Sequence, residues 1–64
     1  MITVNGEPRA LTGTVDEVLD ALGLEARRGM AVAVDAEVVP KSAWSTTHVN
    51  DGARVEIVTA VQGG

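Results

Sequence analysis

The sequence contains no cysteine, one histidine and one aromatic residue among its 64 residues. Without cysteine the chain has no disulfide, no thiolate metal site and no nucleophilic thiol. A single histidine excludes a metal cluster built from histidines, so we predict no metal site. Stability must come from aliphatic packing in one small domain, which buries only about 60% of its unfolded surface.

Basic residues are also scarce, with five Lys and Arg against nine Asp and Glu and a formal net charge of −4. Because binding to a phosphate backbone requires clustered cations, we do not expect nucleic acid as a partner. No apolar run approaches the roughly 20 residues that span a bilayer. The first residues show neither a charged leader nor a long apolar core, so we expect no secretion signal and a cytoplasmic location.

Short runs of apolar and β-branched residues predict five strands. They are residues 2–4, 7–11, 30–34, 37–39 and 54–58. Asn5-Gly6, between the first two, is typical of a type I′ hairpin turn, whose central residues both have positive φ. Pro8 has no N–H to donate, so the second strand is expected at an edge of the sheet. Residues 35–36 and 50–52 are interpreted as turns, and residues 41–45 as an irregular segment.

One helix is predicted between the second and third strands. Thr14 is the expected N-cap, and Glu17 three residues later completes a capping box. The helix has one apolar face, formed by Val15, Val18, Leu19 and Leu22. Gly23 stands where a left-handed residue ends a helix, and Leu24 is expected to pack back over the last turn.

A single helix can cover one face of one sheet, so the predicted class is a two-layer α+β domain. The β-branched residues at 2–4 and 54–58 suit central strands. This order predicts the β-grasp, a mixed sheet of four to five strands with one main helix packed on one face. We expect this domain at residues 1–58, followed by a flexible tail at residues 59–64.

The predicted tail closes on Gly63-Gly64. Glycine offers no side chain for packing and is entropically costly to order. Two glycines suit a main chain that must enter a narrow site in a partner protein. Extended at ~3.3 Å per residue, residues 59–64 reach about 20 Å. We therefore interpret the tail as a reactive element, with a plainly disordered end as the alternative.

Three segments carry a resemblance to a known family. Residues 4–7 read VNGE, residues 38–44 read VVPKSAW, and residues 51–64 read DGARVEIVTAVQGG. In this order and length they resemble the ThiS sulfur carriers of thiamine biosynthesis, within the ubiquitin-like MoaD/ThiS superfamily. Lys41, Ala53 and the turn at residues 35–36 depart from the residues most common in that family.

The resemblance implies a protein co-substrate, not an enzyme. An E1-like adenylyltransferase of the ThiF type would use ATP and Mg²⁺ to adenylate the Gly64 carboxylate, and the carrier itself would bind no cofactor. Sulfur from cysteine, mobilised by a cysteine desulfurase, would then replace AMP. The Gly64 thiocarboxylate would donate this sulfur to a thiazole synthase of the ThiG type. Both partners would recognise Ala60, Val61, Gln62 and Gly63.

Two further positions invite a binding interpretation. Val58 and Glu56 lie on the sheet face expected to point away from the helix, and form a candidate docking surface, although isolated surface valines are ordinary. Trp44 is either an interface anchor or the closure of one end of an aromatic-poor core, and we favour the core.

Other functions stay open at this point. Ser45, His48 and Asp51 suggest a catalytic triad, but they fall in one short polar loop without an oxyanion-hole motif, which disfavours catalysis. A sulfur carrier for molybdopterin or cysteine synthesis is the nearest alternative, and the short chain with its VEIV ending favours thiamine. A ubiquitin-like interaction module without tail chemistry is the alternative from another class.

Overall fold

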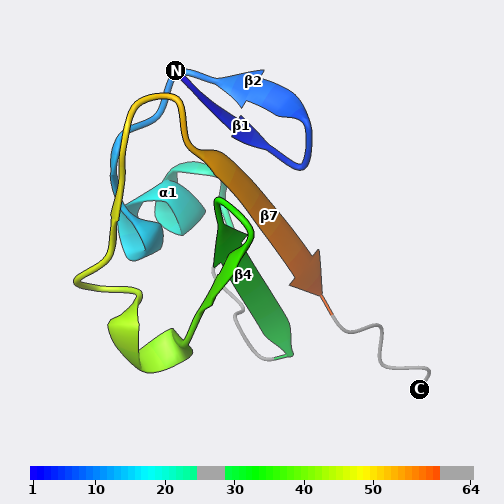
Figure 1. Ribbon diagram of the computed structural model, residues 1–64. Helices are drawn as coiled ribbons and strands as arrows, with labels where there is room; N and C mark the ends of the chain where they lie inside the picture. The colour runs from blue at the N-terminus through cyan, green and yellow to red at the C-terminus, as the bar shows by residue number, and fades with distance from the viewer. Residues whose placement is uncertain (25–28, 60–64) are drawn as a thin grey trace.

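The computed structural model of the chain describes residues 1–24 and 29–59 (Figure 1). Its main sheet has five strands in the order β2-β1-β7-β4-β5. They are β1 (Ile2–Val4), β2 (Glu7–Arg9), β4 (Met30–Val34), β5 (Glu37–Val39) and β7 (Arg54–Thr59). β1 and β7 run parallel, and every other neighbouring pair is antiparallel, so the sheet is mixed as predicted.

The positions of the strands follow from their residues. β1 and β7 carry the β-branched side chains and lie inside the sheet, with β7 at its centre, which confirms the expectation. β2, which contains Pro8, lies at an edge, where its missing N–H leaves no ladder bond unmade. Asn5 and Gly6 have φ values of 50° and 85°, as a type I′ turn requires.

Helix α1 (Val15–Ala21) begins and ends as the sequence predicts. Glu17 N donates to Thr14 Oγ1 at 3.2 Å, and Thr14 N donates to Glu17 Oε1 at 2.8 Å, which completes the capping box. Gly23, at φ 76°, donates to Asp20 O, and Leu24 N donates to the carbonyl five residues earlier. These two bonds form a Schellman motif. In residues 1–24 and 29–59 no helix is long and apolar enough to cross a membrane.

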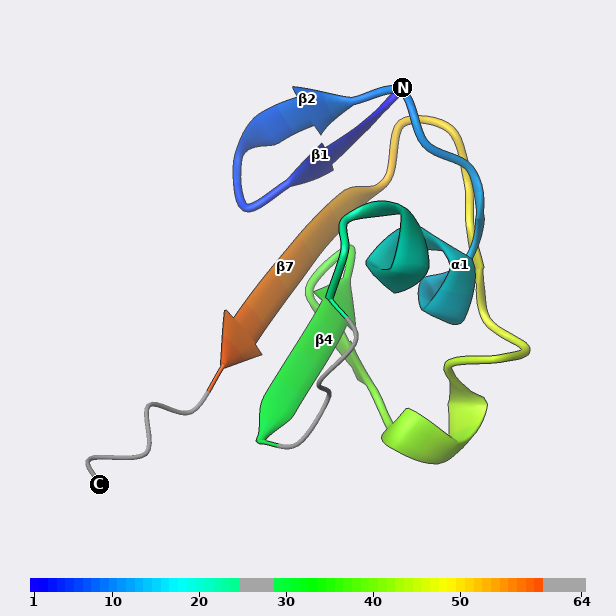
Figure 2. The ribbon, with the colours of Figure 1, turned by 180° about the vertical axis from the view of Figure 1, so that it is seen from behind.

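The core lies between α1 and one face of the sheet. α1 is on the far side of the sheet in Figure 1 and on the near side in Figure 2. The largest fully buried side chains are Ile2, Val15, Val18, Leu19, Val32 and Val55. Trp44 is 2% exposed, and its Nε1 donates to Val39 O at 2.8 Å, so the core interpretation of this residue is confirmed. The arrangement is the β-grasp.

The structure also contains elements that the sequence did not predict. β3 (Gly13–Thr14) and β6 (His48–Val49) pair as a separate two-stranded sheet. The segment expected to be irregular contains a 3₁₀ helix, η1 (Lys41–Ala43), which follows Pro40. β2 ends at Arg9 instead of residue 11, and β7 extends through Thr59, a residue predicted to belong to the tail. Strands of two residues are too short to show a periodicity, and Thr59 is held by pairing with Met30.

Candidate functional site

The residues predicted to carry the chemistry and its recognition lie outside the described residues. They are Ala60, Val61, Gln62, Gly63 and Gly64. The structure describes β7, the strand that leads into them. The site is therefore described by the last residues of β7 and by the residues that contact this strand.

β7 is paired along both of its sides, but to different lengths. β4 pairs with it over five positions, from Val34 opposite Val55 to Met30 opposite Thr59. β1 pairs with it only at Arg54 and Val55. Val55 is 1% exposed in the core, which fixes the first half of the strand. Beyond Val55, the backbone of β1 has already turned into its hairpin.

A side chain continues the contact where β1 ends. Ile57 N donates to Asn5 Oδ1 at 2.8 Å, and Asn5 Nδ2 donates to Ile57 O at 3.1 Å. Both polar groups of the Ile57 backbone on this side are therefore satisfied by one amide. Sequence reasoning identified Asn5 as a turn residue but missed this role, because the two residues are 52 positions apart and no local pattern encodes their pairing.

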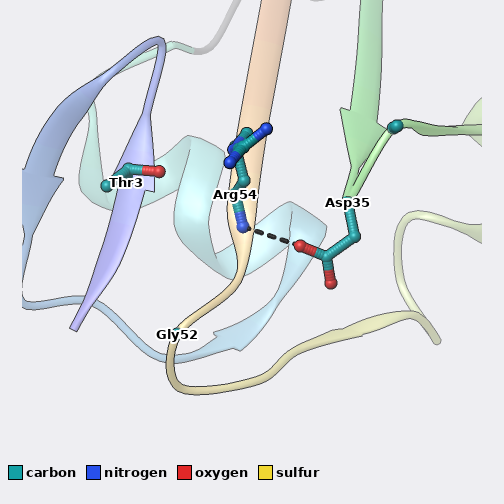
Figure 3. A pocket seen from close by; sticks show the side chains of 5 residues that line it. Thr3, Asp35, Gly52 and Arg54 are labelled. Atoms are coloured by element: carbon teal, nitrogen blue, oxygen red, sulfur yellow. Dashed lines mark hydrogen bonds between the residues drawn. The ribbon is translucent and has the colours of Figure 1, made fainter.

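The hairpin turn between β4 and β5 holds the other end of β7 in a related way. Arg54 N donates to Asp35 Oδ1 at 2.9 Å (Figure 3). In return, Asp35 N donates to Arg54 O at 2.8 Å. These residues line an open hollow of about 470 Å³ together with Thr3, Ala36 and Gly52. Within this hollow, the Asp35 carboxylate and the Asp35 backbone N–H fix the start of the strand.

The outer face of the sheet, opposite α1, carries the candidate docking surface. Val58 is 64% exposed and Val38 is 77% exposed, the two largest apolar side chains on this face. They line a shallow hollow of about 190 Å³ with Ala31, Val32, Ala33 and Glu56. Val55 and Ile57 point into the core side, so the predicted division of the two faces of β7 is confirmed. We call Ala31, Ala33, Val38, Glu56 and Val58 the outer patch.

The alternative catalytic residues have structural roles of other kinds. His48 is an exposed residue of β6 and pairs with Thr14 of β3. The Asp51 carboxylate accepts a hydrogen bond from the amino group of Met1. The triad hypothesis gains no support from this arrangement. Among residues 1–24 and 29–59, no three His, Asp or Glu side chains are grouped so that they could hold a metal ion.

Comparison with known proteins gives consistent relatives. The model of the ThiS family matches residues 2–64. A sulfur carrier protein ThiS from Thermus thermophilus is 40% identical over 65 residues, which cover 100% of both chains. A thiazole synthase from Paramagnetospirillum magneticum is also 40% identical over 65 residues, covering 98% of this chain. The chain spans only 20% of the length of that thiazole synthase.

Solved structures agree with the sequence relatives. The crystal structure of the thiamine biosynthesis protein ThiS from Geobacter metallireducens superposes with a TM-score of 0.83 at 33% identity, covering 98% of this chain and 97% of that one. A solution structure of a thiamine biosynthesis protein from the same organism gives a TM-score of 0.78 at 34% identity, covering 98% and 86%. With its family model, its relatives and its β-grasp fold in agreement, the chain belongs to the ThiS family.

Proposed function

We propose that this chain, a sulfur carrier of the ThiS family and not itself a catalyst, carries sulfur as a thiocarboxylate on Gly64 and delivers it to thiazole synthase for the thiazole of thiamine. One observation supports this proposal most strongly: the central strand of the sheet, held on both sides, leads directly into the segment that ends in Gly63-Gly64. The folded domain then positions the reactive end of the chain for the partner proteins.

The proposed chemistry begins with a carboxylate, which is a poor electrophile. Attack of the Gly64 carboxylate on the α-phosphorus of ATP forms an acyl-adenylate and releases pyrophosphate. A reduced sulfur nucleophile then forms a C–S bond as the C–O bond to AMP breaks. We propose that an E1-like adenylyltransferase of the ThiF type carries out the first step with Mg²⁺ and ATP. A cysteine desulfurase is the proposed indirect source of the sulfur: it would take the sulfur from cysteine as a persulfide, and a thiol reductant would supply the two electrons that bring it to the thiocarboxylate level.

A thiazole synthase is the proposed acceptor of the sulfur. A segment similar to this chain makes up part of the thiazole synthase from Paramagnetospirillum magneticum. Joining two activities in one polypeptide raises the effective concentration of one for the other. The relationship supports a partnership between a carrier of this family and a thiazole synthase. Adenylation consumes ATP, which fits the cytoplasmic location that we propose for the chain.

Recognition is proposed to use two parts of the chain. Residues 60–63, with glycine at position 63, would enter the narrow sites of the partners with little steric hindrance. The outer patch would contact the partner surface nearby, with Val58 and Val38 as its largest apolar side chains and Glu56 as its charged residue. Because Val58 lies in the same strand that leads into the tail, a partner that receives the tail meets the outer patch at the same time.

The proposal is tested by intact-mass measurement after incubation with a ThiF-type enzyme, ATP, Mg²⁺, a cysteine desulfurase, cysteine and a thiol reductant. We expect a mass increase equal to the exchange of one oxygen for sulfur, located on Gly64 by fragmentation. The matched control is Gly64→Ala, which we expect to fold normally and to be adenylated poorly, because a Cβ hinders closure around the terminal carboxylate. Normal adenylation of that variant would count against the proposed site.

A further inference from the structure

On the side that faces β1, hydrogen bonds reach every second residue from Ala53, just before β7, to Ile57. Thr3 N donates to Ala53 O at 3.0 Å, and Asn5 N donates to Val55 O at 2.8 Å. At Ile57 the Asn5 side chain takes the next place, with its Nδ2 donating to Ile57 O and its Oδ1 accepting from Ile57 N. The Asn5 amide thus imitates one further peptide group of β1, at a point where the β1 backbone has left the sheet.

Asparagine is suited to both tasks at this position. Its φ of 50° lies in the left-handed region, which asparagine adopts more readily than most residues. Its side-chain amide contains one donor group and one acceptor group, as a peptide group does. Aspartate would keep the acceptor and lose the donor. Glycine would keep the turn and lose both contacts.

The contact lies close to the point from which the tail departs. Thr59, the last residue of β7, is two residues beyond Ile57. On this side of the strand, Asn5 and Ile57 themselves line a groove of about 330 Å³, together with residues that include Leu24 and Thr59. β4 continues to pair with the other side as far as Thr59. The Asn5 amide therefore secures β7 on its second side within this groove, two residues before the strand ends.

We propose that Asn5 is a positioning residue, whose side-chain amide fixes the direction in which β7 delivers the tail to the activating enzyme. This inference rests on the proposed function, because it assigns a residue to the same reaction. The reason is entropic: a strand end that is ordered before the encounter spares the partner part of the cost of ordering it. Asn5 makes no contact with the reacting atoms and acts through Ile57.

The kinetic test compares Asn5→Gly with Asp35→Gly in adenylation by the ThiF-type enzyme. Each variant removes a side-chain contact to β7 and keeps a residue that tolerates positive φ, but only Asn5 lies near the tail. If the contact orders about one residue, the KM for the Asn5→Gly carrier rises roughly five- to thirtyfold. We expect kcat to stay unchanged, and Asp35→Gly to leave both constants unchanged.

The structural test measures hydrogen exchange at the Ile57 amide in the isolated carrier. Exchange should be slowest in the natural chain, faster in Asn5→Asp, and fastest in Asn5→Gly. Asp35→Gly should not accelerate it. This order separates the local contact from a general loss of stability, which would accelerate exchange in both glycine variants.

The outcomes distinguish a failure of the proposed function from a failure of the positioning role of Asn5. If the natural chain is not adenylated at all, the proposed function fails and the positioning role falls with it. If the natural chain is adenylated but Asn5→Gly keeps its KM, only the positioning role is overturned. An equal rise of KM in Asp35→Gly, or unchanged exchange at Ile57 in Asn5→Gly, would also overturn it.

Discussion

The two ends of β7 are held by similar contacts from hairpin turns. At each end the first residue of a tight hairpin turn reaches the backbone of β7: Asp35 at Arg54, and Asn5 at Ile57. Both turn residues have a φ of 50°. The two hairpins flank the central strand on opposite sides, so β7 is fixed near its start by one and near its end by the other.

The Asp35 and Asn5 contacts differ in the groups that form them and in the other interactions that hold each end of β7. Asp35 accepts one bond through its carboxylate and donates another through its backbone, whereas Asn5 makes both bonds through its side-chain amide. The start of β7 is additionally fixed by the buried Val55, while its last residues carry the exposed Val58. We therefore expect the start of β7 to tolerate the loss of its Asp35 contact better than the end of β7 tolerates the loss of its Asn5 contact.

The largest expected change in stability comes from the buried half of β7. Val55→Ala removes two methyl groups from a site that is 1% exposed. We expect the free energy of unfolding to fall by about 2 kcal/mol, and Tm to fall by roughly 8–16 °C for a domain of this size. Thermal unfolding followed by circular dichroism measures this. A loss as small as that of Val58→Ala would contradict the assigned division of faces.

Asn5→Ala should destabilise the chain more than Asn5→Gly. Both variants lose the two bonds to Ile57, but only alanine must also adopt the left-handed conformation. That strain costs about 1–2 kcal/mol. Denaturant midpoints compare the two variants directly. Equal midpoints would show that the turn relaxes in Asn5→Ala, so that the positive φ of residue 5 adds no cost for alanine.

Ala36→Gly should raise stability. Ala36 has a φ of 69°, at the turn position where glycine follows Asn5 in the other hairpin. Relief of this strain should stabilise the chain by about 1 kcal/mol and raise Tm by roughly 4–8 °C. Gly6→Ala is the matched converse, since Gly6 has a φ of 85° and should lose stability on substitution. A neutral Ala36→Gly would contradict this view of the turn.

The smallest expected change in stability is at Val58. Because this side chain is 64% exposed on the outer patch, Val58→Asp should alter the free energy of unfolding by less than about 0.5 kcal/mol. The same variant should weaken binding to the activating enzyme or thiazole synthase, measured by titration calorimetry. Unchanged binding to both partners would remove Val58 from the proposed docking surface, without affecting the assignment of Gly64.

Much of the fold could be predicted from local patterns. The capping box at Thr14 and Glu17, the left-handed Gly23 and the Asn5-Gly6 turn all use residues a few positions apart, and all are confirmed. Pro8 correctly indicated an edge strand. Of the candidate site, the face that carries Val58 was predicted, because strand alternation determines it.

What the sequence did not reveal depends on contacts between distant segments. β3 and β6 are two residues each and exist because Gly13 and Val49 meet in the folded chain. The bond between Asn5 and Ile57 requires the parallel register of β1 and β7, which no local pattern encodes. η1 lies between Pro40 and Trp44, and the Trp44 indole donates to Val39 O, a contact made only in the folded chain.

The most direct test of the account follows heavy-isotope sulfur from cysteine to product in a reconstituted mixture of carrier, ThiF-type enzyme, desulfurase and thiazole synthase. We predict that the label appears first on Gly64 and then in the thiazole ring. It should appear in neither place when the carrier lacks Gly64. Labelled thiazole formed with that truncated carrier, or label delivered instead to a molybdopterin precursor, would contradict the account.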